Sequence, residues 1–353
     1  MQLLVLPGDG IGPEITAATL AVLQAAADAS GVVLDVTERD IGLKSLAEQG
    51  TTLPEAVLDA IPEADGVILG PVSHYDYPAG MPNPSAALRT KFALYANIRP
   101  CRSREGLSIL RKPMDLVIVR ENTEGFYADR SMHAGPGEFM PDADSAFAIR
   151  KITAAACARV ARAACEIAMG RTKRVTAVHK ANVLKLTDGL FLREVRKVAA
   201  EFPEVTLDEV IVDAAAALLI RSPERFDVIV TTNMFGDILS DEASELSGSL
   251  GLGGSINQGD AICVAQAQHG SAPDIQGQGI ANPTSLILSA AMLLEWQAQR
   301  SGDAALGACG RRIEAAVETV LADPAKRTRD VGGPLGTEAF AEAVIAAIRD
   351  QRA

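Results

Sequence analysis

The chain has no run of five or more Lys and Arg residues, and its 353 residues carry a formal net charge of −12. Proteins that bind nucleic acid or anionic membrane surfaces usually present a basic stripe or patch. We therefore expect neither a nucleic-acid partner nor a membrane partner. A small anionic ligand is still compatible with this composition, because a few local arginines can oppose the field of the whole protein.

Cysteine is also scarce. The five residues are Cys101, Cys157, Cys165, Cys263 and Cys309, and no CxxC motif occurs. An odd number of cysteines without that motif argues against a disulfide framework and against a zinc knuckle. We therefore expect a reducing compartment and a cytoplasmic protein.

Long hydrophobic runs are absent. The longest, "LILSAAMLL" at 286–294, is far shorter than the roughly 20 residues that a membrane span requires. The apolar N-terminus "MQLLVLPGDG" has no basic segment before it and no A-x-A cleavage site after it. It therefore predicts a first β-strand rather than a signal peptide.

What the sequence does contain is a regular alternation of strand-like and helix-like segments. A helix opened by Pro13 is predicted to end before Gly31, and a second long helix is predicted over 147–170. Apolar strands such as "DGVILGP" stand between the helical segments. This alternation predicts an α/β fold with much parallel pairing, and the length predicts two domains.

Two aspartates, Asp237 and Asp241, follow the apolar strand "FDVIVTTN" and stand four residues apart. On a helix this spacing places both carboxylates on one face, at the edge of the sheet where α/β proteins bind ligands. Hard oxygen ligands suit Mg²⁺ or Mn²⁺. The alternative is that the two acids only complement a helix dipole. Asp213, at the end of the predicted strand "VIVD", is a candidate third ligand. No helix has to supply this third carboxylate.

Three arginines stand beside or at the ends of apolar segments: Arg89, Arg99 and Arg120. One such arginine is usually a surface ion pair, but three in an acidic protein predict a polyanionic small substrate, since guanidinium groups bind carboxylates with two hydrogen bonds. Tyr127 and Lys180 are candidates for proton transfer. Taken alone, each has the alternative of an ordinary side chain at the edge of the core.

Seven segments, taken in order, resemble the β-decarboxylating dehydrogenases, the family of isocitrate and isopropylmalate dehydrogenases. They cover nearly the whole chain and are "LPGDGIGPE", "LRTKFALYANIRP", "VRENTEGFY", "HKANVLK", "NMFGDILSDE", "HGSAPDIQGQGIANP" and "DVGGPLGTEAF". The first has GxGxG rather than the GxGxxG of dinucleotide-binding Rossmann domains. The resemblance accordingly implies an α/β fold that is not a Rossmann fold. It has two α/β domains with the active-site cleft between them.

The first, cofactor-side domain would be discontinuous and contain residues 1–98 and 250–353. The second, residues 99–249, would hold the metal ligands and the dimer interface. The resemblance implies a homodimer with shared active sites, in which Asp213 and Lys180 come from the partner subunit. Asp237 and Asp241 would bind Mg²⁺ or Mn²⁺ together with that Asp213.

The remaining roles follow from the same resemblance. Arg89, Arg99 and Arg120 would bind the malate carboxylates, Tyr127 would protonate the enol carbon, and Lys180 would handle the proton of the C2 hydroxyl. The residues implied in cofactor binding are Ile11, Asn182, His269, Gly270, Ser271, Ala272, Asp274, Ile275 and Asn282. Asp274 favours NAD, because a carboxylate accepts hydrogen bonds from ribose hydroxyls and repels the 2′-phosphate of NADP. The alternative is that Asp274 caps a turn beside Pro273.

The expected reaction is the NAD-dependent and metal-dependent oxidative decarboxylation of a 3-substituted malate to a 2-oxo acid. Asn83 and Ser85, in "MPNPSAALR", stand where the family recognises the substituent, and they favour a polar group of the isocitrate type. A smaller alkyl group or tartrate is an alternative, and isopropylmalate is not excluded. Two further alternatives are a metal-dependent decarboxylase or lyase that uses no nicotinamide, and a non-catalytic regulatory subunit.

Overall fold

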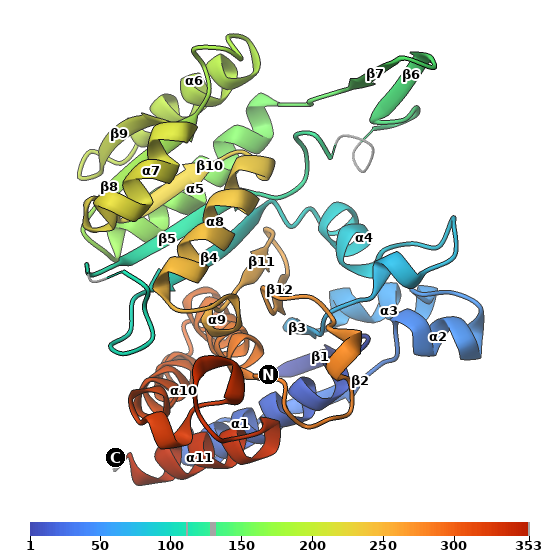
Figure 1. Cartoon of the computed structure of the whole chain (residues 1–353), viewed down its shortest axis with the longest axis vertical. Coiled ribbons are helices and arrows are strands. Elements are labelled where there is room, and N and C mark those ends of the chain that lie inside the picture. Colours follow the sequence, from blue (N-terminus) through green and yellow to red (C-terminus); the bar gives the residue numbers. More distant parts are fainter. Residues whose placement is uncertain (111, 128–131, 352–353) are drawn as a thin grey trace.

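The computed structural model describes residues 1–110, 112–127 and 132–351. Within these residues, ten strands form one sheet that runs through the whole molecule (Figure 1). In spatial order they are β2 (Asp35–Glu38), β1 (Gln2–Leu6), β3 (Gly66–Leu69), β12 (Cys263–Gln266), β11 (Ile256–Gln258), β4 (Ala96–Arg102), β5 (Asp115–Glu121), β10 (Val228–Thr231), β8 (Arg174–His179) and β9 (Thr206–Ile211).

The two ends of the sheet are parallel and its middle is antiparallel. Strands β2, β1, β3 and β12 pair in parallel, as do β5, β10, β8 and β9. Between these groups, β11 pairs antiparallel with β12 and β4, and β4 pairs antiparallel with β5. The predicted α/β fold with much parallel pairing is therefore confirmed. The antiparallel ladder brings Asn97 opposite both Arg120 and Asn257.

The helices divide into two lobes (Figure 1). The first lobe surrounds β1–β3, β11 and β12 with helices from both ends of the chain, namely α1 (Gly12–Ser30), α2 (Gly42–Gln49), α3 (Glu55–Ala60), α4 (Pro84–Lys91), α9 (Thr284–Ser301), α10 (Ala304–Ala322) and α11 (Thr337–Asp350). The second lobe surrounds β5 and β8–β10 with α5 (Ala154–Met169), α6 (Thr187–Ala199), α7 (Val212–Arg221) and α8 (Asn233–Ser247). The predicted domain boundaries at 98/99 and 249/250 stay a prediction.

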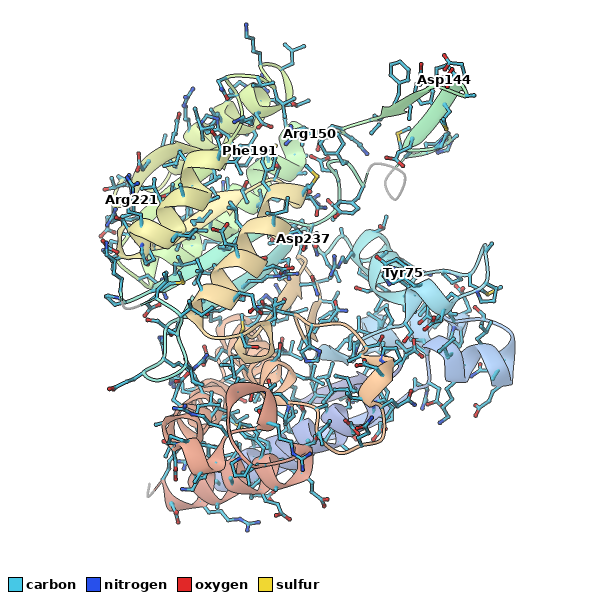
Figure 2. The ribbon with its side chains drawn as sticks, in the orientation of Figure 1. Tyr75, Asp144, Arg150, Phe191, Arg221 and Asp237 are labelled. Carbon is cyan, nitrogen blue, oxygen red and sulfur yellow. The ribbon has the colours of Figure 1, made fainter. Side chains whose placement is uncertain are left out.

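A two-stranded arm projects from the second lobe. It consists of β6 (Glu138–Asp142) and β7 (Ser145–Ala148), and Figure 2 shows Asp144 at its tip, well away from the body of the lobe. The predicted helix over 147–170 is wrong in its first residues, because part of that segment is strand β7. The helix begins only at Ala154, where the hydroxyl of Thr153 accepts a hydrogen bond from the backbone N–H of Ala156 at 3.2 Å. Such a cap satisfies a backbone donor at the start of a helix.

The hydrophobic core differs between the two faces of the sheet. One face carries a single cluster that includes side chains from β1, β5 and β10 and from α1, α5, α9, α10 and α11, so it crosses both lobes. The other face carries two separate clusters, one under α3 and α4 and one under α7 and α8. Between those two clusters the central strands present polar side chains.

Helix α1 has a proline in its first turn and ends at Gly31 with φ +67°, as the sequence predicts. In the described part of the chain, no helix combines the length and the apolar character that crossing a bilayer requires.

Candidate active site

The site lies on the face of the sheet that carries the two smaller hydrophobic clusters, in the gap between them. Because side chains alternate along a strand, the residues that flank the buried Ile98 and Val119 point to this opposite face. Among them are Asn97, Arg99 and Arg120. Together with Asn257 on β11 and Gln266 on β12, they form a row of polar side chains across four neighbouring strands. Arg99 and Arg120 are only 6% and 3% exposed. Guanidinium groups buried to this degree require anionic partners.

Helix α8 supplies those partners. Arg99 Nη1 lies 2.8 Å from Asp241 Oδ1, and Arg99 Nη2 lies 3.6 Å from Asp237 Oδ1. Arg120 pairs directly with Asp237 Oδ1. Figure 2 shows Asp237 on the side of α8 that faces α4 in the first lobe. The predicted placement of Asp237 and Asp241 on one helix face is observed, and the structure brings both against Arg99 and Arg120.

Two asparagines hold the arginines in place. Asn97 Oδ1 accepts a hydrogen bond from Arg99 Nε at 2.6 Å, and Asn233 Oδ1 accepts from Arg120 Nη2 at 2.7 Å. Asn233 in turn donates to the carbonyl of Glu124 at 2.9 Å. Neither asparagine was singled out in the sequence. The periodicity of the strand "ANIRP" could have indicated Asn97, because it shares a face with Arg99.

Burial shifts the pKa values in this cluster. It lowers the pKa of Arg120 to about 10, and the neighbouring positive charge of Arg99 acts in the same direction. Burial also raises the pKa of Asp241, while Arg99 opposes that rise. Two guanidinium groups and two carboxylates balance in charge, so the cluster is close to neutral before a ligand is bound.

The carboxylates retain room for a cation. The ion pairs with Arg99 and Arg120 engage the Oδ1 atom of each aspartate, and the Asp237 and Asp241 side chains are 36% and 50% exposed. Their second oxygens therefore face outward, and hard oxygen donors of this kind suit Mg²⁺ or Mn²⁺. Within the described residues, however, no three His, Cys, Asp or Glu side chains are grouped as a metal site. Asp213 thus does not join Asp237 and Asp241 in the same chain.

Asp213 lies instead beside Lys180, and its carboxylate pairs with the Lys180 ammonium. That hydrogen bond lowers the pKa of Asp213. The strand predicted to end at Asp213 ends at Ile211 instead, and α7 begins at Val212 and places Asp213 in its first turn. Lys180 follows β8, and its backbone N–H donates to the buried Asp188 at 2.5 Å. Asn182 is exposed in the same turn, so it accompanies Lys180 rather than the other predicted cofactor residues.

Tyr127 is half-buried in the segment after β5, near Arg120. Arg89 and Ser85 both lie on α4 and converge on one acceptor. Gln266 Oε1 accepts from Ser85 Oγ at 3.1 Å and from Arg89 Nη2 at 3.5 Å. It also accepts from Asn257 Nδ2 at 3.4 Å.

Asn83 caps the same helix, and its Oδ1 accepts from the backbone N–H of Ala86 at 3.3 Å. This cap explains why α4 begins where it does. The predicted contact of Asn83 with substrate stays a prediction.

Of the remaining predicted cofactor residues, Ile11 and Ser271 meet where the turn after β1 touches the loop after β12. Ile11 N–H donates to the carbonyl of Ser271 at 2.8 Å, and Ser73 Oγ donates to Ser271 Oγ at 2.8 Å. The buried carboxylate of Asp9 accepts from the backbone N–H groups of Leu43 at 2.7 Å and Ser73 at 2.9 Å. Asp9 thereby joins three loops, and its role was not anticipated from the sequence.

Further along this loop, burial lowers the pKa of His269. Ala272 adopts the left-handed conformation with φ +39°. Asn282 donates to Asp330 Oδ2 at 3.0 Å. Gly270 and Asp274 are exposed and Ile275 is half-buried. Among the described residues, the Asp274 carboxylate has no hydrogen-bond partner, and only its backbone carbonyl accepts from Gln278, at 2.9 Å. This geometry does not support a turn-capping role for its side chain.

The comparison with family models matches residues 2–344 to the family described as "Isocitrate/isopropylmalate dehydrogenase". The chain belongs to this family. An "Isocitrate/homoisocitrate dehydrogenase" of Thermus thermophilus is 42% identical over 350 residues, covering 99% of this chain and 98% of that protein. A "3-isopropylmalate dehydrogenase" of Methanothermobacter thermautotrophicus is 40% identical over 351 residues, covering 99% of both.

A comparison with solved structures supports the same family. An isocitrate dehydrogenase from Methylococcus capsulatus superimposes with a TM-score of 0.87 at 39% identity, covering 99% of each chain. The isocitrate/isopropylmalate dehydrogenase fold, with its two α/β lobes, is therefore confirmed, as is the family. The chain is a dehydrogenase, and dehydrogenases are oxidoreductases.

The contact between the turn after β1 and the loop after β12 leads to a testable prediction about Gly10. A Cβ at Gly10 would lie 2.0 Å from the Ser271 carbonyl oxygen, and its φ is +58°. Gly10→Ala should therefore separate the two loops. It should lower the free energy of unfolding, in a urea titration, by more than the roughly 1–2 kcal/mol expected for left-handed strain alone. If the loop after β12 binds the nicotinamide cofactor, as the resemblance implies, Gly10→Ala should also weaken NADH binding, measured by fluorescence, about tenfold or more.

Gly50→Ala is the matched control for this experiment. Gly50 has φ +74°, but a Cβ added there would have no other atom within 4 Å. The control should show the left-handed strain without any change in NADH affinity. Equal effects of the two substitutions on both quantities would contradict the assigned role of the loop contact.

Proposed function

We propose that the protein catalyses the NAD-dependent and Mg²⁺- or Mn²⁺-dependent oxidative decarboxylation of a 3-substituted malate to a 2-oxo acid. The observation that carries the proposal is the cluster of Arg99 and Arg120 with Asp237 and Asp241, held at the centre of a sheet of this family. Buried arginines suit a substrate with several carboxylates, and outward carboxylate oxygens suit a divalent cation.

Residues of the candidate site can be assigned to each step of this oxidative decarboxylation. Arg89, Arg99 and Arg120 would bind and orient the substrate carboxylates, so that the C2 hydroxyl lies near Asp237 and Asp241. When bound, the divalent metal supplies polarisation of the C2 oxygen and the nicotinamide supplies a hydride acceptor. The partner subunit's Lys180, as a neutral amine, would accept the proton of the C2 hydroxyl. After CO₂ leaves, Tyr127 would donate a proton to the enol carbon.

The substituent at C3 would be polar. Ser85, Gln266 and Asn257 form a hydrogen-bonded group beside Arg89, and these side chains offer donors and acceptors rather than an apolar wall. An isocitrate-type substrate can form hydrogen bonds with this surface, whereas an isopropyl group would cover its half-buried Ser85 and Gln266 without forming any. Tartrate and a 3-alkylmalate remain the alternatives within the family. A decarboxylase without nicotinamide would have no use for the loop that Ile11 and Ser271 hold together.

The substrate proposal is tested with a panel of 3-substituted malates, including isocitrate, isopropylmalate and tartrate. NADH formation is followed by absorbance, with Mn²⁺ present. We expect kcat/KM for isocitrate to exceed that for isopropylmalate, and we expect Tyr127→Phe to lower kcat more than it changes KM. No NADH formation with any member of the panel would favour the lyase or the regulatory subunit. Wild-type kcat in Tyr127→Phe would remove that residue from the mechanism.

The proposed metal site predicts dependence on a divalent ion. Chelation with EDTA should abolish turnover, and Mn²⁺ should restore it. Asp237→Asn should raise the Kd for Mn²⁺, measured by electron paramagnetic resonance, by about tenfold or more. Glu242→Gln, on the same helix but outside the ion-pair cluster, is the matched control and should bind Mn²⁺ as the wild type does. Full turnover in metal-free buffer would overturn the metal site.

We further propose a homodimer with shared active sites. Its support is that Lys180 and Asp213 pair with each other and do not reach Asp237 and Asp241 in one chain. Large exposed apolar side chains near these elements fit an interface. They include Ile220, Ile238 and Leu186, and on the arm Phe139, Met140 and Phe147.

Complementation tests the shared sites. Lys180→Met and Asp237→Asn should each abolish activity as separate homodimers. After subunit exchange, a heterodimer contains one site with an unaltered Asp237 and an unaltered Lys180. Random mixing should therefore restore about a quarter of the wild-type activity, because half of the dimers are mixed and each has one intact site of two. No recovery after exchange verified by mass spectrometry would contradict sharing.

The NAD preference rests on the exposed carboxylate of Asp274. Repulsion between this charge and a 2′-phosphate is about 1 kcal/mol or more in a water-exposed site, which corresponds to about fivefold discrimination or more. Asp274→Lys combined with Ile275→Tyr should raise kcat/KM with NADP and lower it with NAD, while the substrate KM stays nearly constant. Equal use of both cofactors by the wild type would contradict this assignment.

We also propose a cytoplasmic location, because all five cysteines are free and buried. Burial raises the pKa of Cys101 to about 11 and that of Cys157 to about 12, which keeps both as unreactive thiols.

A further inference from the structure

Arg150 is a third buried arginine of the second lobe, and it lies outside the cluster of Arg99 and Arg120. It stands between β7 and α5, and Figure 2 shows it on the side of the lobe from which the arm extends. Its side chain is 8% exposed and pairs with Asp188, whose side chain is 0% exposed. Because both charges lose their hydration, such a pair contributes little net stability by itself, although the loss of one partner is costly.

The carboxylate of Asp188 connects this arginine to the turn of Lys180. Its Oδ1 accepts from Arg150 Nη1, and its Oδ2 accepts from the backbone N–H of Lys180 at 2.5 Å. Arg150 Nη1 also donates to Thr187 Oγ1 at 2.8 Å. The carbonyl of Lys180 closes the turn by accepting from the N–H of Leu184 at 2.8 Å. The position of the Lys180 main chain therefore depends on where Arg150 holds Asp188.

The segment that carries Tyr127 lies against the same arginine. Gly125 and Lys151 exchange two backbone hydrogen bonds, at 2.9 Å and 3.0 Å, which pair this segment with the one that contains Arg150. The centroid of the Phe126 ring lies 5.8 Å from the guanidinium carbon of Arg150, within the range of a cation–π contact. Since Phe126 directly precedes Tyr127, a displacement of the guanidinium group would be passed to Tyr127.

A third set of contacts leads to α8, the helix of Asp237. Arg150 Nη2 donates to Thr232 Oγ1 at 2.9 Å, and Thr232 is the N-cap residue of α8. The centroid of the Phe235 ring, in the first turn of α8, lies 5.3 Å from the guanidinium carbon. A guanidinium group carries its N–H donors in one fixed plane, so a single arginine can hold three segments in one relative orientation.

We propose that Arg150 is a positioning residue of the active site. It fixes the turn of Lys180 through Asp188 and the segment of Tyr127 through Phe126, both relative to α8. The inference rests on the proposed function, in which Lys180 and Tyr127 transfer protons. In the proposed homodimer Lys180 serves the partner's site and Tyr127 serves the site of its own chain, so one Arg150 side chain would contribute to both sites.

The contacts of Arg150 also predict which kinetic constant depends on it. Among the described residues its ion pair is with Asp188, and it forms none with Asp237 or Asp241. The substrate carboxylates and the metal would be bound by groups that Arg150 does not contact. Its replacement should therefore slow turnover without weakening the binding of substrate or metal.

Arg150→Lys tests this expectation, because it keeps the positive charge beside Asp188 and removes the planar set of donors. The assay uses the malate that the wild type oxidises best, with Mn²⁺ present, and follows NADH absorbance. We expect kcat to fall about tenfold to a hundredfold, as for reacting groups displaced by about 1 Å. KM, and the Kd for Mn²⁺, should stay within about twofold of the wild-type values. The urea midpoint of unfolding is measured in parallel, so that a loss of folded protein is recognised.

Arg162→Lys is the matched control. Arg162 lies on α5, pairs with Glu201, and lies 5.8 Å from the ring centroid of Phe202. The same substitution there removes the same kinds of contact, none of which leads to a proposed catalytic residue. Its kcat should equal that of the wild type.

Hydrogen exchange measures the positioning without any turnover. In the substrate-free protein, the amide hydrogen that Lys180 donates to Asp188 should exchange about tenfold faster in Arg150→Lys than in the wild type. Mass spectrometry of a peptide that contains Lys180 follows this exchange. Peptides from α9 and α10, which lie in the other lobe, should exchange as in the wild type.

The proposal is overturned by a wild-type kcat in Arg150→Lys, by an equal loss of kcat in Arg162→Lys, or by unchanged exchange of the Lys180 amide. A wild type that oxidises no malate would overturn the proposed function instead, and the exchange rate would then decide whether Arg150 positions this turn. If Arg150→Lys does not fold, Arg150→Met combined with Asp188→Asn takes its place. That pair of substitutions removes both buried charges together, and it should show the same separation of kcat from KM.

Discussion

The alternation of side chains along the four central strands is the constraint on which the candidate site depends. Each of these strands buries one face in the core that crosses both lobes, so its polar residues are confined to the other face. On that face the two smaller cores leave a gap, and Gln266, Asn257, Asn97, Arg99 and Arg120 occupy it. A shift of register by one residue would send these side chains into the core, which makes the strand pairing part of the chemistry.

Because Arg99 and Arg120 are buried, they depend on the carboxylates of Asp237 and Asp241. A guanidinium group that is almost completely buried is costly without a partner, and the α8 carboxylates provide one before any ligand is present. The same carboxylates remain partly exposed, so a cation can approach their free oxygens. The cluster is thus held by its own charges, with Asn97 and Asn233 fixing the orientation of the guanidinium planes.

The family, the fold and part of the candidate site could be predicted from the sequence, because they depend on short motifs and on spacings within one segment. The family and fold follow from seven motifs, and the spacing of Asp237 and Asp241 is enough to place them on one helix face. The residues that were missed depend on contacts between distant segments. Asn233 meets Arg120 across 113 positions of the chain, and Asp9 meets Ser73 across 64. The helical turn at Asp213 was missed because an apolar strand passes directly into α7 without a capping side chain.

The order of the strands has a consequence for how the chain folds during synthesis. The second lobe is built from a nearly continuous stretch of sequence, so its strands can pair soon after they leave the ribosome. The first lobe is different, because β12 lies between β3 and β11, and α1 packs against α9, α10 and α11. Strands β1–β3 and the apolar face of α1 must therefore wait, exposed, until the last hundred or so residues are made. The long delay makes the N-terminal segment of this dehydrogenase the part of the nascent chain with the greatest need of protection from aggregation.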